Sequence, residues 1–381
     1  MFEWSEEELA IRDAVRGFVD KEVRPLQDEL EHGDLPPYDV IRRFYAAFGL
    51  EQMAGDACDR AIARAEAGEE SDGDGTGPLD PAMSVIVSSE FCRVSMGIPA
   101  AIGVSVGLAG GTINARGTVE QRRRWARDLM TFAKVGAWAI TEPDAGSDAF
   151  GGMRTTVRRD GDEWVLNGQK TFITNGPYAD TIVVYAKHDD GTGLDRRDQP
   201  VLTFVLDSGM PGLTQSPPLR KMGMHSSPTG QLFFDDVRLG DDRLLGSPSD
   251  GAGRESARAN FVVERIGIAA LALGVIEECL RLCVDYARSR ELWGRPIGEF
   301  QLIQLKLAQM EVARVNVRNM VFSTIEQRRA GRLPSLAEAS AIKLYASTAA
   351  TDVAMEAVQL FGGNATWPST ASSSSPATPS R

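Results

Sequence analysis

The stretch Asn260-Phe-Val-Val-Glu-Arg-Ile-Gly-Ile-Ala-Ala-Leu-Ala-Leu-Gly-Val-Ile-Glu-Glu-Cys-Leu-Arg-Leu-Cys-Val-Asp-Tyr-Ala-Arg-Ser-Arg-Glu-Leu-Trp-Gly294 decides the fold of the C-terminal third. Its apolar residues recur at steps of three and four, which predicts one long helix from about 260 to 294. Glu264 interrupts the apolar pattern, because it shares a helical face with Ile268, Leu271 and Val275. A carboxylate in such surroundings is partly desolvated and its pKa is raised, as a general base near neutral pH requires. The alternative is an acid kept in the first turn by the helix dipole.

Helical spacing extends on both sides of this stretch. Pro296 opens a further predicted helix that runs to about Ala330, and a capping box of Ser335 and Glu338 starts a third one. Three long helices with short connections favour an antiparallel bundle. Residues 1–135 are also predicted to be mostly helical, with a glycine-rich acidic surface loop at about 68–78.

The middle of the chain has the pattern of β-strands. Short alternating runs end at Asp160-Gly161, Asn167-Gly168 and Asn175-Gly176, which are strong local hairpin signals. Further strands are predicted at 181–186, 200–206 and 231–234. The predicted fold class is α+β, with an N-terminal helical domain (1–135), a central antiparallel barrel-like β domain (136–241), a C-terminal helical bundle (250–364) and a low-complexity, disordered tail (365–381).

Composition limits the possible functions. The 381 residues are 43% hydrophobic and carry a formal net charge of −12, so binding to nucleic-acid phosphates or to an anionic membrane surface is disfavoured. No apolar run reaches the length expected of a membrane span. The acid-rich first residues lack the basic region of a signal peptide, which predicts a cytoplasmic location.

The cysteines and histidines restrict the chemistry further. Cys279 and Cys283 lie one helical turn apart, where a metal pair is conceivable but buried packing is favoured. Cys58 and Cys92 are scattered, so no disulfide framework is predicted. With three histidines in the whole chain, a Ser-His-Asp triad is disfavoured, and catalysis is expected to rest on carboxylates or a bound cofactor.

One loop suits an acceptor-rich ligand. Thr141-Glu-Pro-Asp-Ala-Gly-Ser-Asp148 combines turn residues with the hydroxyls of Thr141 and Ser147. Taken alone, Phe172-Ile-Thr174 indicates a strand, and Arg290-Glu-Leu-Trp-Gly294 indicates a helix end with its glycine.

In their order along the chain, however, these segments resemble the acyl-CoA dehydrogenase family, over nearly the whole length to Asn364. The resemblance rests on an ordered set of motifs: Thr141-Glu-Pro-Asp-Ala-Gly-Ser-Asp148, Asn167-Gly-Gln-Lys-Thr-Phe-Ile-Thr-Asn-Gly176, Lys221-Met-Gly-Met224, Arg290-Glu-Leu-Trp-Gly-Arg-Pro-Ile297, Gln301-Leu-Ile-Gln304 and Gln359-Leu-Phe-Gly-Gly-Asn364. It implies an FAD-dependent oxidoreductase of fatty acid metabolism that converts an acyl-CoA to a trans-2-enoyl-CoA. It also implies an electron-transfer flavoprotein as redox partner and a homotetramer built as a dimer of dimers.

The resemblance also implies residue roles. Glu264-Arg265 matches the isovaleryl-CoA and long-chain types, in which Glu264 would be the catalytic base for the α-proton while the β-hydride passes to flavin N5. Ser147 and Arg265 would contact the acyl-CoA. The residues implied to line the flavin are Trp138, Ile140, Thr141, Ser147, Phe172 and Thr174, and those implied to bind the FAD of a neighbouring subunit are Arg290, Trp293, Gln301, Gln359, Gly362 and Gly363.

The chain departs from the family pattern in two places. The acidic stretch at 68–77 replaces the family's usual segment near the acyl pocket, so chain length is not predicted. After Asn364, the residues Ala365-Thr-Trp-Pro-Ser-Thr-Ala-Ser-Ser-Ser-Ser-Pro-Ala-Thr-Pro379 can be encoded by GC-rich codons. Read from one base earlier, these codons spell Gly-Tyr-Met-Ala-Glu-Tyr-Arg-Val-Glu-Gln-Leu-Ala-Arg-Asp-Ala, the expected family continuation. We therefore predict a truncated or frame-shifted C-terminus that weakens flavin binding, which sequencing the gene across the Asn364 codon tests.

Two other functions stay open on this sequence. An acyl-CoA oxidase or a flavin monooxygenase on the same fold would let oxygen reach the reduced flavin. A truncated chain without catalysis could act as an interaction protein, and a purified protein that stays colourless after addition of FAD would favour it.

Overall fold

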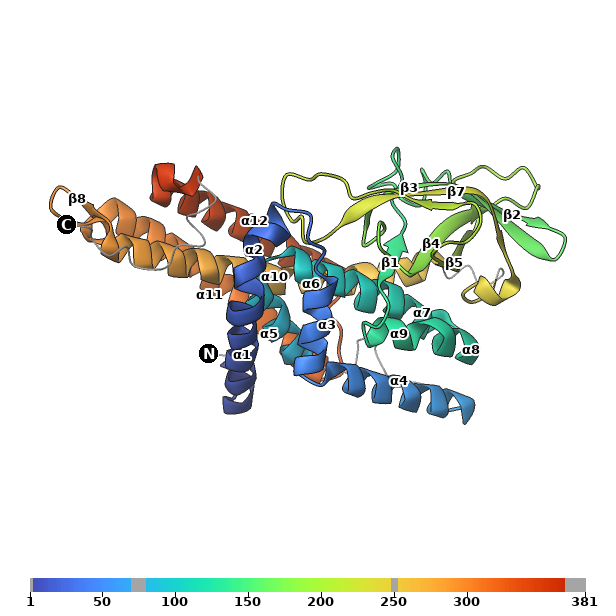
Figure 1. Ribbon diagram of the computed structural model, residues 1–381, viewed down its shortest axis with the longest axis horizontal. Coiled ribbons are helices and arrows are strands. Elements are labelled where there is room, and N and C mark those ends of the chain that lie inside the picture. The colour runs from blue at the N-terminus through green and yellow to red at the C-terminus, as the bar shows by residue number, and fades with distance from the viewer. Residues whose placement is uncertain (1–2, 70–79, 248–252, 367–381) are drawn as a thin grey trace. The chain divides into compact units, whose positions relative to one another are not determined.

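The computed structural model describes residues 3–69, 80–247 and 253–366 of the chain (Figure 1). Two compact units make up the chain, and each is discontinuous in sequence. The bundle unit comprises Met1–Gly33, Asp80–Pro99 and Phe261–Arg381, and the sheet unit comprises Asp34–Leu79 and Ala100–Asn260. The predicted N-terminal helical region is thus divided between the two units.

The sheet unit is built on one curled, mostly antiparallel β-sheet (Figure 1). Among the described residues the strand order is β1-β4-β2-β3-β7-β6, with β5 paired to β4 outside this path. The strands are β1 Gly136–Ala139, β2 Thr156–Asp160, β3 Glu163–Thr174, β4 Thr181–His188, β5 Val201–Asp207, β6 Leu213–Gln215 and β7 Thr229–Leu239. The predicted α+β class is confirmed, with the difference that β1 and β2 run parallel to β4.

Strand β4 pairs with β1, β2 and β5, and its residues from Thr181 to Lys187 are all buried. A strand buried along its whole length is covered on both faces, which explains why its sequence is apolar without alternation. The core cluster of the sheet includes Trp164, Leu166, Val184, Phe204 and Val237.

One of the three hairpin predictions is confirmed and two are wrong. Strands β2 and β3 form a hairpin with Asp160 opposite Glu163, and Gly161 has the positive φ of 62° that the turn requires. Asn167-Gly168 is no turn, because β3 continues through it and only the register with β7 shifts there. At Gly168, with φ of 143°, a Cβ atom would lie 2.6 Å from Cα of Thr155, so close backbone approach explains the glycine. Asn175-Gly176 ends β3 and leads away from its neighbours in the sheet.

Short helices complete the sheet unit. They are α3 Tyr38–Ala47, α4 Leu50–Glu66, α7 Gly111–Arg116, α8 Val119–Gln121 and α9 Arg127–Met130, with π-helical turns at Gly103–Gly110 and Arg122–Ala126. Helix α6, Gly97–Ile102, spans the boundary between the two units.

Long helices form the bundle unit. They are α1 Glu6–Phe18, α5 Pro81–Cys92, α10 Gly253–Ser289, α11 Gln301–Arg329 and α12 Leu336–Phe361, with the short α2 Gln27–Glu31. Helix α10 starts in the sheet unit, and its residues from Phe261 onward belong to the bundle unit. The capping box of Ser335 and Glu338 is present at the start of α12, as predicted, and Ser5 with Glu8 caps α1 in the same way. Apolar residues of α10, α11 and α12 pack into one core cluster that includes Ile276, Val317 and Val353.

The end of the long helix differs from the prediction. Helix α10 ends at Ser289 rather than near Gly294. The following residues form a two-stranded hairpin of β8, Glu291–Leu292, and β9, Arg295–Pro296. Trp293 and Gly294 have φ of 52° and 78°, and a turn with two positive φ values matches the twist of an antiparallel pair. The glycine of this segment therefore belongs to a β-turn and not to a helix cap.

Two helical stretches are long and apolar enough to cross a membrane by length and composition, Gly97–Arg116 and Ala257–Ser289. The prediction that no run reaches this length is therefore wrong. Core helices of globular proteins pass the same test, and both stretches contribute fully buried residues, such as Ile113 and Ile276, to the packed units.

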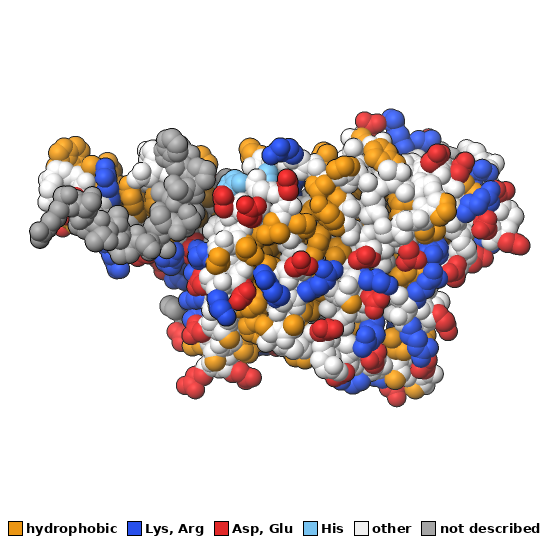
Figure 2. Space-filling view, in the orientation of Figure 1, with side chains coloured by type: hydrophobic (Ala, Val, Ile, Leu, Met, Phe, Trp, Pro, Cys, Tyr) orange, Lys and Arg blue, Asp and Glu red, His pale blue; other side chains and the backbone are white. Residues whose placement is uncertain are grey.

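Several predictions fall outside the described residues. Most of the predicted surface loop at 68–78 and of the tail after Asn364 lies there, although Gly362–Thr366 forms a short 3-10 helix. The four cysteines are free. Of the two that were predicted to pack in the interior, Cys283 is buried and Cys279 is half-buried, and Cys58 and Cys92 are also buried. On the face seen in Figure 2, basic and acidic side chains are interspersed.

Candidate active site

The loop from Thr141 to Asp148 follows β1 and is fixed by its buried side chains. Glu142 and Ala145 exchange backbone hydrogen bonds, each with an N to O distance of 3.1 Å. Their side chains are 4% and 2% exposed, while Ser147 is exposed and Thr141 half-buried. A Cβ atom at Gly146 would meet nothing within 4 Å, so the outer side of the loop is open. The loop is thus anchored by the buried side chains of Glu142 and Ala145, and it carries the hydroxyls of Thr141 and Ser147.

Glu142 is held by three hydrogen-bonding groups in the sheet unit. Its carboxylate accepts from Nζ of Lys170 at 2.8 Å and from the backbone N–H groups of Arg154 at 2.6 Å and Thr155 at 3.0 Å. Burial acts to raise the pKa of the Glu142 carboxyl, but the Lys170 ammonium and these hydrogen bonds keep it below its ordinary value. Full burial lowers the pKa of Lys170 to about 8 against the attraction of Glu142, so the pair is ionised at pH 7.

Phe172 projects from a bulge in β3. The register with β7 shifts between Lys170 and Ile173, and Phe172 adopts a left-handed φ of 56° that a bulky residue rarely takes. Lys170 and Ile173 are buried on either side, whereas the Phe172 side chain is 67% exposed. The backbone N–H of Thr171 donates to the carbonyl of Thr141 at 2.9 Å, which ties the bulge to the loop. A strained backbone that exposes an aromatic ring is typical of a ligand-binding position.

The remaining predicted flavin residues of the sheet unit are less accessible. The Trp138 ring is 8% exposed, packs edge-on against Tyr185 at 5.2 Å and donates from Nε1 to its hydroxyl at 3.2 Å. Ile140 is 5% exposed, and Thr174 is half-buried at the end of β3. Ser147 and Phe172 are therefore the exposed members of this group, while Thr141 and Thr174 are half-buried.

These accessible groups fit a flavin. An exposed aromatic ring can stack on a planar ring system, and hydroxyls and open backbone N–H groups beside it suit oxygen acceptors such as a pyrophosphate. The aromatic ring and the hydroxyls lie on two segments, 141–147 and 170–174. The hydrogen bond from the Thr171 N–H to the Thr141 carbonyl ties these segments together.

Glu264 lies on α10 in the bundle unit. Its neighbours Ile268, Leu271 and Val275 are half-buried rather than part of the core, and Glu264 itself is exposed. Desolvation by the surrounding protein still raises the pKa of its carboxyl, against the opposing charges of Arg265 and Lys343. Within the part of the chain that the structure describes, this carboxylate makes no hydrogen bond or ion pair, so it is available to a ligand. The raised pKa agrees with the sequence prediction, and the exposure differs from it.

The other predicted residues also lie in the bundle unit. Trp293 is 88% exposed at the tip of the β8–β9 hairpin. Gln301 is the first residue of α11, and Gln359 lies in the last turn of α12, which ends where Gly362 takes a φ of 59°. These residues are exposed. Their predicted contact with a neighbouring subunit's FAD stays a prediction.

The sequence reasoning missed the Glu142–Lys170 pair. Both residues lie in quoted motifs, and the available signal was Lys170 itself, a charged residue flanked by the strand pattern Gln-Lys-Thr-Phe-Ile. A lysine inside a strand of a half-buried sheet requires a buried partner if it points inward.

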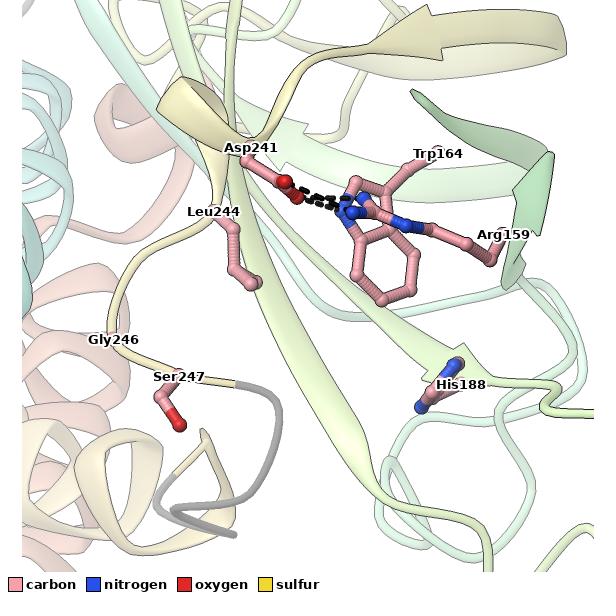
Figure 3. A pocket seen from close by; sticks show the side chains of 7 residues that line it. All are labelled: Arg159, Trp164, His188, Asp241, Leu244, Gly246 and Ser247. Carbon is pink, nitrogen blue, oxygen red and sulfur yellow. Dashed lines mark hydrogen bonds and ion pairs between the residues drawn. The ribbon is translucent and has the colours of Figure 1, made fainter. Parts of the chain in front are cut away.

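A separate hollow lies at the far end of the sheet and contains none of the predicted residues (Figure 3). Arg159 donates to both carboxylate oxygens of Asp241, at 2.6 and 2.9 Å, and the Trp164 indole N–H donates to Asp241 at 2.7 Å. Its polar groups satisfy one another, with His188 edge-on to Trp164 at 5.1 Å. This arrangement ties β2 and β3 to the segment that follows β7 and does not resemble the loop at Thr141.

Comparison with known proteins identifies the family. The family models described as acyl-CoA dehydrogenase N-terminal, middle and C-terminal domains match residues 5–133, 137–237 and 251–375. A Bacillus subtilis (strain 168) protein named acyl-CoA dehydrogenase is 33% identical over 359 residues, which cover 94% of this chain and 88% of that protein. The chain belongs to the acyl-CoA dehydrogenase family. Acyl-CoA dehydrogenases are FAD-dependent oxidoreductases.

Solved structures similar to this acyl-CoA dehydrogenase family member support the fold. Butyryl-CoA dehydrogenase from Megasphaera elsdenii matches with a TM-score of 0.81 and 30% identity, covering 98% of this chain and 93% of that chain. A glutaryl-CoA dehydrogenase from Mycobacterium smegmatis in complex with FADH2 matches with a TM-score of 0.81 and 27% identity, covering 95% and 86%. A structure described as the electron transferring flavoprotein of Acidaminococcus fermentans contains a chain that matches with a TM-score of 0.82 and 31% identity, covering 96% and 90%.

Proposed function

We propose that this chain catalyses the α,β-dehydrogenation of an acyl-CoA thioester to a trans-2-enoyl-CoA, with Glu264 as the base. The observation that carries the proposal is the state of Glu264, an accessible carboxylate with a raised pKa and no partner among the described residues. A base must be free of competing hydrogen bonds, and a pKa raised toward the working pH favours proton transfer. Glu264 has no hydrogen bond among the described residues, and desolvation raises the pKa of its carboxyl.

In this mechanism Glu264 removes the α-proton beside the thioester carbonyl. Arg265, the next residue on α10, holds the acyl-CoA end of the site. The α-carbon is a weak acid, so positioning of the substrate against the Glu264 carboxylate supplies much of the rate. FAD, when bound, supplies the acceptor for the β-hydride.

The proposed binding site for the FAD is formed by residues of the sheet unit. Thr141 and Ser147 would donate hydroxyl hydrogen bonds to the cofactor, Phe172 would cover the ring system, and Thr174 would contact it from the end of β3. Ser147 would also contact the acyl-CoA. From a neighbouring subunit, the residues that would complete the FAD site are Arg290, Trp293, Gln301, Gln359, Gly362 and Gly363.

The neighbouring subunit requires an oligomer, and we propose a dimer of dimers. In the single chain, α11 exposes Leu302 at 75%, and α12 exposes Leu344 at 68% and Met355 at 63%. Large apolar side chains grouped on neighbouring helices are typical of a protein interface. Light scattering after gel filtration should give a tetramer, and Leu344→Glu should shift it to smaller species while Leu194→Glu, in an exposed loop, leaves it unchanged. A monomer at micromolar concentration contradicts this assembly.

An electron-transfer flavoprotein is the proposed acceptor of the electrons. The similarity to a chain from a structure described as an electron transferring flavoprotein supports this choice. Stopped-flow reoxidation should be fast with such a flavoprotein and slow with air. Fast reoxidation by air alone would instead favour an acyl-CoA oxidase.

The test of the reaction uses purified protein loaded with FAD. A panel of acyl-CoAs of increasing chain length and branching is mixed with it without oxygen, and bleaching of the flavin band is recorded. At least one acyl-CoA should bleach the wild-type band, and Glu264→Gln should abolish bleaching with FAD still bound.

Glu277→Gln is the matched control. Glu277 lies on the same helix, and its pKa is also raised by burial, but it faces Arg314 at 3.9 Å. This variant should bleach like wild type. Equal loss of bleaching in both variants, or full bleaching in Glu264→Gln, would contradict Glu264 as the base.

A further inference from the structure

Lys170 is completely buried in the sheet unit, with 0% of its side chain exposed. Its ammonium donates to the Ile140 carbonyl at 3.0 Å and to the Glu142 carboxylate at 2.8 Å. These two acceptors flank Thr141 in sequence. A fully buried lysine is rare, because removing its ammonium from water costs on the order of several kcal/mol. Hydrogen-bonding and charged partners of this kind offset that cost.

The Glu142–Lys170 ion pair connects the two segments of the proposed flavin site, the loop at 141–148 and the bulge at 170–173. Glu142 anchors the loop on one side and fixes the start of the segment before β2 through the N–H groups of Arg154 and Thr155. Lys170 is the last residue of β3 in register with β7 before the bulge that exposes Phe172. One ion pair therefore sets the distance between the Thr141 loop and the Phe172 bulge.

We propose that Glu142 and Lys170 are positioning residues for the cofactor, which hold the Thr141 hydroxyl and the Phe172 ring in the geometry that binds FAD. The inference rests on the proposed function, since FAD is the ligand. Neither residue touches the cofactor in this scheme. Their effect passes through the backbone of Thr141 and through the Thr171 N–H to Thr141 carbonyl hydrogen bond.

An ion pair suits this task better than apolar packing does. Apolar contacts tolerate small sliding movements, whereas an ammonium held by a carbonyl and a carboxylate, with the carboxylate held by two N–H groups, fixes both direction and distance. Replacing a buried ion pair by apolar groups of similar volume is often neutral for stability. Loss of the pair should therefore affect the alignment of the proposed flavin site more than the fold.

The experiment compares wild type with Lys170→Met, the double variant Glu142→Gln/Lys170→Met, and the control Lys187→Met. Lys187 is the matched control because it is also 0% exposed in the same sheet, but it donates to the carbonyls of Arg197 and Gln199. Circular dichroism of the apoprotein reports the fold. Titration with FAD, followed by flavin fluorescence, gives the dissociation constant, and the reduction potential of the bound flavin is measured by dye equilibration.

The double variant should fold and should bind FAD at least about tenfold more weakly than wild type, a misplacement cost of about 1.4 kcal/mol. The potential of the flavin should also shift. Lys187→Met should keep the wild-type dissociation constant for FAD and the wild-type flavin potential, even if its free energy of unfolding is lower. Lys170→Met should bind FAD no better than the double variant.

A folded double variant with wild-type FAD affinity and potential overturns the proposal. Equal weakening in Lys187→Met also overturns it, because the effect would then follow from any buried lysine. If neither variant at position 170 yields folded protein, the pair is required for folding and the positioning role is rejected. Wild-type protein that binds no FAD is a different result, because it rejects the proposed function itself.

Discussion

Two glutamates, one in each unit, show how the surroundings of a carboxylate decide what it can do. Glu142 is buried, accepts hydrogen bonds from an ammonium and two N–H groups, and has a lowered pKa. Glu264 is exposed, has no partner among the residues that the structure describes, and has a raised pKa. The same side chain is thus a permanent anion in one place and a group ready to take a proton in the other.

The comparison also explains why the two residues tolerate different changes. Glu142 fixes the geometry of the three groups that donate to its carboxylate, so its loss leaves a buried charge and two N–H groups unsatisfied. Among the described residues of the bundle unit, no group depends on Glu264 in this way. The structural role and the chemical role are therefore separable by mutation.

The largest expected effect is on the rate of flavin reduction, which should distinguish the catalytic role of Glu264 from the positioning role of Glu142. Glu264→Gln should lower the rate constant of flavin reduction by on the order of 10³-fold while FAD affinity is retained, because a positioned base contributes about that much. Glu142→Gln should weaken FAD affinity and should reduce flavin at a near wild-type rate once FAD is saturating. Single-turnover stopped-flow with both variants measures this. A common defect in rate and affinity for both variants would remove the distinction.

The second effect concerns stability. Glu142→Ala should lower the free energy of unfolding by about 3 to 5 kcal/mol, because it leaves the buried Lys170 ammonium without its anion. Glu264→Ala should change it by at most about 0.5 kcal/mol, as is usual for an exposed position. Urea denaturation of the apoproteins, followed by far-UV circular dichroism, gives both values. Similar losses for the two variants would mean that Glu264 is structural.

A smaller effect is expected at the exposed ring. Phe172→Ala should weaken FAD binding by about 1 kcal/mol, roughly fivefold, because a stacking contact is lost. Phe172→Gly should weaken binding equally but should stabilise the apoprotein by about 1 kcal/mol, since glycine accepts the φ of 56° without strain. Fluorescence titration and thermal melting test the two halves. Unchanged binding in both variants would place the flavin elsewhere.

The smallest expected effect is the pH dependence of stability, which has opposite signs at the two carboxyls. A lowered pKa at Glu142 gives stability that is present above the ordinary value of 4.5 and is lost as the pH falls through the folded-state pKa. A raised pKa at Glu264 gives stability that is present below 4.5 and is lost as the pH rises through the folded-state pKa.

As the pH falls below 4.5, wild type should therefore progressively lose its stability advantage over Glu142→Gln. As the pH falls from 7 toward 4.5, wild type should gain stability relative to Glu264→Gln. The second change should stay within about 0.5 kcal/mol, because water screens an exposed group. Urea denaturation at several pH values measures both differences. Parallel trends would contradict the assigned pKa directions.

Much of the fold could be predicted from the sequence, since periodicity reports burial. The spacing in α10 and the capping box at Ser335 indicated the helices of the bundle unit, and the Asp160-Gly161 turn indicated a true hairpin. Asn167-Gly168 misled because the same dipeptide suits a bulge, and only the pairing of β3 with both β2 and β7 decides between them. Local sequence does not encode that choice.

The candidate site divides in the same way. The resemblance implied that Thr141, Ser147 and Phe172 line the flavin, and this stays a prediction. In the structure Ser147 and Phe172 are exposed, Thr141 is half-buried, and the hydrogen bond from Thr171 to Thr141 ties the two segments. The Glu142–Lys170 contact joins residues 28 apart in sequence, so no local pattern reports it. The division of the N-terminal helices between two units has the same origin, because it depends on contacts across the whole chain.

The hairpin at the end of α10 gives this protein a built-in optical reporter. Trp293 has 88% of its side chain exposed, while Trp125, Trp138 and Trp164 are at most 8% exposed. Indole emission shifts to shorter wavelength when water leaves the ring, so a subunit or a cofactor that covers Trp293 would move the red edge of the spectrum and leave the blue edge in place. Assembly could then be followed in real time without a label.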